Sequence, residues 1–133
     1  MTVQKLFRSV RSSIPFPGFR AYSLDDEVAL YRRRAEIALK EERFLDAIVF
    51  LAKVLRLNPY DLGARMAVAE IYHFQLLELE KAIMSYEQVL ATAGYDDSNP
   101  FCRTAKEAIR SLANAANSSE VAALEDENQR AAG

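Results

Sequence analysis

The chain contains one cysteine, one histidine and no tryptophan, and it has only four glycines and four prolines. Because Cys102 is alone, no internal disulfide can form, and we expect a reducing compartment. Cys102 and His73 fall short of the ligand set of a zinc site, so each is expected to be a packing or surface residue. The scattered glycines form no phosphate-binding loop. The composition therefore predicts a protein that is not an enzyme and binds no metal or other cofactor.

Long apolar runs are also missing. No stretch approaches the ~20 apolar residues that cross a bilayer, and no continuous apolar segment near the start indicates a secretory signal. Residues 1–24 carry a charge of +4, while the whole chain carries −2, which leaves −6 for residues 25–133. This balance gives the molecule no bulk attraction for nucleic acid. We expect a cytoplasmic protein, or one bound peripherally at the cytoplasmic side of a membrane.

What the chain does contain is a repeat across residues 31–94. Seven identities link its two halves at an offset of 34 or 35, so one residue is inserted between the two blocks. Ala35, Glu36 and Ile37 recur as Ala69, Glu70 and Ile71, and Ala47, Ile48, Val54 and Leu55 recur as Ala82, Ile83, Val89 and Leu90. Apolar residues lie three or four apart in each copy, which predicts two helices joined by a short turn. One such pair cannot bury its own apolar face, so the pairs should stack.

At these positions the chain resembles the tetratricopeptide repeat (TPR) family, whose pattern is W-x2-L-G-x2-Y, then A-x3-F, then P. The corresponding residues are Tyr31, Arg34, Ala35, Ala38, Ala47, Leu51 and Pro59 in the first copy, and Arg65, Val68, Ala69, Tyr72, Ala82, Tyr86 and Gly94 in the second. Arg34 and Arg65 depart from the family, which prefers Leu and an aromatic there. The resemblance implies an all-α stack of two repeats and a capping helix that acts as an adaptor or scaffold by binding proteins. Alanines 35, 47, 69 and 82 are expected where helices cross closely.

The chain divides into three parts: a basic N-terminal arm over residues 1–22, a repeat domain over 23–116, and a polar C-terminal tail over 117–133. We expect disorder or a frayed helix in the tail. Helices are expected over residues 23–42, 44–57, 62–77 and 79–92, and a last helix begins near Pro100. The expected helix starts are capped by Ser23 and by Ser98 or Asn99, and the expected helix ends are marked by Pro59 and Gly94.

In the family that the chain resembles, the first helix of each pair lines a groove that holds a partner segment. Carried over by position, the resemblance implies a groove formed by Arg32, Arg33, Glu36, Leu39, Lys40, Met66, Glu70, His73 and Phe74. Its basic residues and its apolar, adaptable residues predict a ligand with an acidic residue next to an apolar anchor. A solvated helical face is the alternative. Repetition explains the two glutamates more simply than acid–base chemistry does.

The arm is a second candidate surface. Its apolar, aromatic and basic side chains are expected either to fold back over one end of the stack or to contact a partner, and they are Leu6, Phe7, Arg8, Val10, Arg11, Phe16 and Phe19. Besides the adaptor, two functions stay open: a small structural or assembly subunit of a larger complex held by the arm, and a protein whose residues 1–14 rest on an anionic membrane surface. Nucleic-acid binding by the arm has no supporting motif.

Overall fold

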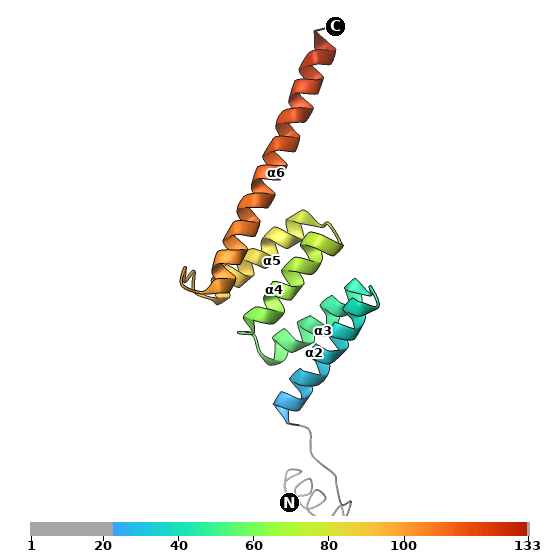
Figure 1. The fold of residues 1–133 in the computed structure, drawn as a ribbon, viewed down its shortest axis with the longest axis vertical. Coiled ribbons are helices and arrows are strands. Elements are labelled where there is room, and N and C mark those ends of the chain that lie inside the picture. The colour runs from blue at the N-terminus through green and yellow to red at the C-terminus, as the bar shows by residue number, and fades with distance from the viewer. Residues whose placement is uncertain (1–22, 133) are drawn as a thin grey trace, which may run out of the picture.

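A computed structural model describes residues 23–132, and every regular element in this range is a helix (Figure 1). The elements are α2 (Leu24–Lys40), α3 (Phe44–Leu57), α4 (Leu62–Glu70), η1 (Ile71–Gln75), α5 (Leu79–Thr92) and α6 (Pro100–Ala131). α2 packs against α3, α4 packs against α5, and α6 packs mainly against α5 and also contacts α4. The all-α prediction is confirmed. The predicted arm contacts between Leu6 and Phe19 lie outside the described residues.

Local side-chain caps set the helix starts. Ser23 Oγ accepts a hydrogen bond from the Asp26 N–H at 3.2 Å, and Asp26 Oδ2 accepts one from the Ser23 N–H at 3.1 Å, which completes a capping box. Asn99 Oδ1 accepts a hydrogen bond from the Phe101 N–H at 2.9 Å. Asn99 is therefore the cap of α6, and the Ser98 hydroxyl instead donates to Asp96 at 2.7 Å.

The two helix ends marked by Pro59 and Gly94 lie where the sequence predicts them, whereas α2 and η1 each end two residues earlier than expected. α3 ends at Leu57, directly before Asn58 and Pro59. After α5, Gly94 adopts a φ of +66°, and the next N–H, that of Tyr95, donates to the Leu90 carbonyl at 2.9 Å. Glycine enters this left-handed region at little cost, so Gly94 stops α5.

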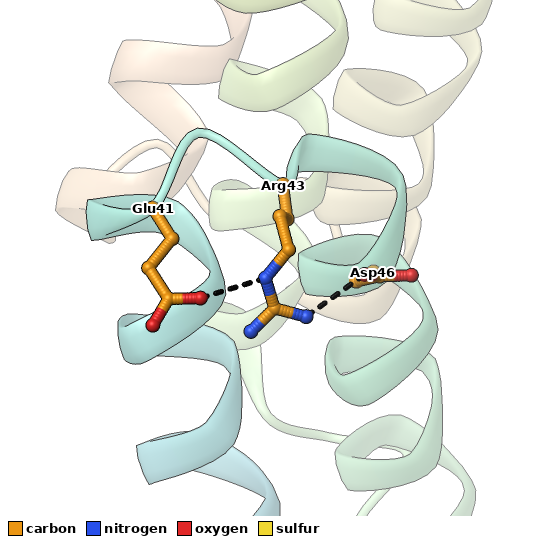
Figure 2. Close-up of polar contacts among 3 residues, drawn as sticks. All are labelled: Glu41, Arg43 and Asp46. Atoms are coloured by element: carbon orange, nitrogen blue, oxygen red, sulfur yellow. Dashed lines mark hydrogen bonds and ion pairs between the residues drawn. The ribbon is translucent and has the colours of Figure 1, made fainter.

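A single arginine bridges the turn between α2 and α3 (Figure 2). Arg43 Nε donates to Glu41 Oε2 at 2.8 Å, and a terminal guanidinium nitrogen of Arg43 donates to Asp46 Oδ2 at 2.9 Å. Glu41 follows the last residue of α2, and Asp46 lies in the first turn of α3. The side chains are exposed, so the bridge orients the turn more than it stabilises the fold.

The core consists of two clusters that share α4. Ala64 and Ile71 pack backward against α2 and α3, whereas Met66 and Ala69 pack forward against α5 and α6. The predicted positions of close helix crossing are all almost completely buried: Ala35, Ala47, Ala69 and Ala82. The first helix of the second pair thus packs on both sides, against the first pair and against α5 and α6.

The extra residue of the second copy is absorbed inside a helix. Ala38 of the first copy corresponds to Tyr72 of the second, at an offset of 34. Glu42 corresponds to Leu77, at an offset of 35, and both Glu42 and Leu77 have a left-handed φ. Between these points η1 is a π-helix, in which the Leu76 N–H donates to the carbonyl five residues earlier at 2.9 Å. A π-turn holds one residue more than an α-turn. The insertion therefore widens the helix at this turn instead of lengthening the loop.

α6 continues beyond the predicted boundary at residue 116. We expected disorder or a frayed helix over residues 117–133, but the structure shows a regular helix to Ala131 that projects from the stack (Figure 1). Beyond Leu112 its side chains are exposed, so packing does not hold it. Alanine and glutamate favour helix, no proline or glycine interrupts residues 101–132, and Asp126 pairs with Arg130 at 3.5 Å. Local propensity therefore accounts for the segment.

Candidate interaction surface

The nine predicted groove residues divide by exposure. Arg32, Arg33, Glu36, Lys40, Glu70 and Phe74 are exposed, Leu39 and His73 are half-buried, and Met66 is buried. α2 and α4 with η1 supply them, as the resemblance implied. Two of the exposed residues nevertheless have surroundings that differ from the predicted ones.

Met66 does not contribute to the surface. Its side chain is 5% exposed and packs in the core cluster with Ala69 and Tyr86. Met66 precedes Ala69 by three residues, so both side chains lie on the face of α4 that is turned toward α5. The prediction of an adaptable methionine in the groove is therefore wrong.

Arg32 belongs to the joint between the two helix pairs. Asp61 caps α4 through Oδ1, which accepts a hydrogen bond from the Ala64 N–H at 3.0 Å. The other carboxylate oxygen of Asp61 is buried and accepts no hydrogen bond, and the Arg32 guanidinium forms an ion pair with it. The charge of Arg32 is thus already neutralised inside the chain, which corrects its assignment to an acidic ligand. Because Arg32 and Asp61 lie far apart in sequence, neither residue signals the pair.

Arg33 also lies apart from the predicted groove. It is the repeat equivalent of Ala67, at an offset of 34, and Ala67 packs backward against the first pair. The corresponding face of α2 is turned away from the second pair. Within residues 23–132, Arg33 forms no ion pair. The basic end of the groove is therefore reduced to Lys40, while both repeated glutamates stay exposed.

His73 and Phe74 of η1 and Tyr86 of α5 form an aromatic cluster, which we call the η1 cluster. His73 Nδ1 lies 2.9 Å from Tyr86 Oη, and the His73 and Phe74 rings stack with centroids 4.0 Å apart. Tyr86 meets the imidazole edge-on, with centroids 5.7 Å apart. The Phe74 side chain is 62% exposed although it stacks on a half-buried neighbour. The cluster thus presents a supported aromatic ring to solvent.

The Tyr86 phenol of the η1 cluster has a raised pKa. Burial, and secondarily the charge of Glu70, raises the pKa of Tyr86 to about 12. The phenol therefore keeps its proton to high pH. The contact between Tyr86 Oη and His73 Nδ1, together with the stacking on Phe74, holds the His73 ring in place. The sequence analysis did not predict Tyr86 as a site residue. The sequence signal that marks this part of the chain is the change of the repeat offset from 34 to 35.

Cys102 is completely buried in the core cluster that α4, α5 and α6 form, as a small packing residue would be. No group of three or more His, Cys, Asp or Glu side chains within residues 23–132 is placed to hold a metal ion. Over the same part of the chain, no helix has the length and apolar character needed to cross a membrane. No protein-family model, curated protein or solved structure matches the chain.

Proposed function

We propose that this chain is a non-catalytic protein-interaction module of the TPR type, which binds a segment of a partner protein across α2, α4 and η1. The observation that carries this proposal is the η1 cluster. An exposed aromatic ring that is already held by stacking loses little conformational entropy on binding, and such rings are typical anchors of interfaces. Two further features support a repeat stack: residues at the repeat offsets occupy equivalent places, and α4 packs to both sides.

The charges beside the η1 cluster suggest which segment binds. Glu70 precedes Phe74 by four residues, and Glu36 occupies the equivalent position on α2. Neither glutamate forms an ion pair within the described residues, and Lys40 is the remaining basic residue of the predicted groove. The exposed ring of Phe74 is thus accompanied by two glutamates, Glu36 and Glu70, and by one basic residue, Lys40. We therefore propose a ligand with a large apolar residue next to Lys or Arg, in place of the acidic ligand expected from the sequence.

A displayed library of random peptides, selected on the full chain, tests the proposal. We expect enrichment of peptides with an apolar residue beside a basic one. Phe74→Ala should weaken the selected peptides about tenfold or more, because truncation of an anchor residue costs upwards of ~1.4 kcal/mol. Tyr95→Ala is the matched control, because Tyr95 is also 62% exposed but lies after α5. Enrichment of acidic peptides, or equal binding by both variants, would contradict the proposal.

The second candidate is a small structural subunit of a larger complex, and it is favoured by the projecting half of α6. Val121 and Leu124 are exposed there on a helix that packs on nothing within the described residues. When expressed alone, a subunit of this kind should aggregate or have a low unfolding temperature. An adaptor should be a stable monomer. A membrane role for the arm predicts sedimentation with anionic vesicles that weakens at high salt.

A further inference from the structure

Equivalent residues of the two copies have different surroundings at one end of the stack. Ile71 is 4% exposed because it packs on the first pair, but its equivalent on α2, Ile37, is 43% exposed. Ala64 is buried in the same contact, and its equivalent, Leu30, is 39% exposed. Leu30 and Ile37 lie seven residues apart and so share one side of α2. This side, with Arg33 between its two apolar residues, is called the open face.

At the opposite end of the stack, α6 has a polar outer side. α6 uses Cys102, Ala105 and Ile109 to pack backward on the second pair. Its outward side carries exposed Thr104, Glu107 and Arg110, and the last two form an ion pair at 3.2 Å. Terminal units of repeat proteins usually have such a polar outer surface. The open face of α2 has instead the apolar residues of an internal unit, which indicates that something covers it.

We propose that residues 14–22 of the same chain, which lie outside the described residues, cover the open face. Their position makes this possible, because they directly precede Ser23, the cap of α2. Ile37 lies about 21 Å along the helix axis from Ser23. An extended segment of residues 14–22 reaches about 30 Å, so Phe19 and Phe16 can meet Leu30 and Ile37 in turn. The sequence of this segment contains Pro15, Pro17 and Gly18, which disfavour a helix and so agree with the extended path that the proposal requires.

Charge favours this occupant. Residues 14–19 have no charged side chain, so they can lie beside Arg33 without repulsion, and the guanidinium can stack on a phenylalanine ring. Arg20 would then lie near the acidic first turn of α2, which holds Asp25, Asp26 and Glu27. Residues 14–22 thus match the open face in its apolar part and at its acidic end.

A second copy of the chain matches the open face poorly. Two antiparallel copies of α2 that paired Leu30 with Ile37 would place Arg33 of one copy opposite Arg34 of the other. Four guanidinium groups would then meet at the centre of the contact, where like charges oppose association. Arg34 is partly engaged within its own chain, since its guanidinium carbon lies 6.0 Å from the centre of the Phe50 ring. Self-association is therefore the less favourable way to cover the open face.

Fluorescence of the full chain tests the proposal, because the protein has no tryptophan of its own. Phe19→Trp introduces one reporter into the proposed segment, and Phe7→Trp introduces one outside it. Each is combined with Ile37→Glu, which places a charge on the open face, and with Leu79→Glu as the control. Leu79 is 42% exposed, close to the exposure of Ile37, but lies at the start of α5.

We expect Ile37→Glu to shift the emission of Phe19→Trp to longer wavelength and to make it several-fold more accessible to a soluble quencher. Leu79→Glu should leave the emission of Phe19→Trp unchanged, and Phe7→Trp should respond to neither substitution. If the emission of Phe19→Trp is the same with and without Ile37→Glu, the proposal is overturned. It is also overturned if the protein has the mass of a dimer and the effect of Ile37→Glu disappears when the protein is diluted, because a second copy would then cover the open face. Circular dichroism confirms that each variant remains helical.

Discussion

The Arg32–Asp61 pair offers a direct test of how the two helix pairs are joined. Asp61 caps α4 with one carboxylate oxygen and meets Arg32 of α2 with the other. The Asp61 side chain is 8% exposed, whereas that of Arg32 is 44% exposed. Removing either partner therefore changes the free energy of unfolding for a different reason. Single and double alanine variants can separate these contributions.

The expected magnitudes follow from burial. Asp61→Ala removes an N-cap, which costs about 1 kcal/mol, and releases an exposed arginine to water, which adds less than about 1 kcal/mol. Arg32→Ala leaves a buried carboxylate oxygen without its partner and should cost about 1–3 kcal/mol. The double variant should cost no more than Asp61→Ala alone, because that oxygen is then absent. The coupling free energy between the two residues should therefore equal the cost of Arg32→Ala, about 1–3 kcal/mol.

Urea unfolding followed by far-UV circular dichroism measures these free energies. The midpoints should change while the dependence on urea concentration stays constant, because the surface exposed on unfolding is the same. Arg103→Ala is the control: this exposed arginine of α6 forms no ion pair within residues 23–132, so its loss should stay within about 0.5 kcal/mol. Equal midpoints for Arg32→Ala and Arg103→Ala would refute the role of Arg32 in the joint between the two helix pairs.

Three further outcomes are expected, each measured by unfolding of the full chain. Ala47→Leu should destabilise the fold by about 1–3 kcal/mol because the added atoms overpack a buried helix crossing, while Ala52→Leu on the exposed side of α3 should be nearly neutral. The raised pKa of Tyr86 means that the folded state holds its phenolic proton to higher pH than the unfolded state. Its contribution is therefore complete below pH 10 and is lost as the pH rises toward about 12. Tyr86→Phe should remove that part of the pH dependence and cost about 1 kcal/mol at neutral pH for the lost hydrogen bond. Gly94→Ala should cost about 1 kcal/mol through the left-handed backbone alone, since an added Cβ meets no atom within 4 Å, whereas Gly63→Ala inside α4 should gain about 0.5 kcal/mol.

Features that depend on a few neighbouring residues could be predicted from the sequence. The capping box at Ser23, the stop at Gly94 and the burial of Ala47 each follow from short-range geometry or from the repeat spacing. Contacts between distant residues could not. Nothing local marks Arg32 as the partner of a helix cap in the next repeat, and the sequence pattern places Met66 at a groove position although its side chain turns toward α5.

The inserted residue shows where the limit of prediction lies. The change of offset from 34 to 35 requires one extra residue between Tyr72 and Ala82, but a longer loop and a wider helical turn satisfy it equally. The choice depends on tertiary packing. Ile71 must stay buried on the first pair and Ala82 must stay buried against α4, so the extra residue goes to the intervening turn, where His73 and Phe74 can bulge outward.

Identity between repeats therefore indicates packing, and departure from it indicates where to look for function. Residues such as Ala35 and Ala69 are shared because each first helix must approach its second helix closely. The η1 cluster exists only in the copy that gained a residue. Its counterpart in the first copy, at Leu39 and Lys40, has no aromatic ring to present. The open face has the opposite origin: Ile37 is identical to Ile71, but within residues 23–132 no helix pair packs on that side of α2. One pattern can thus form two different surfaces, one where a residue is inserted and one where an apolar position lacks a neighbouring helix pair.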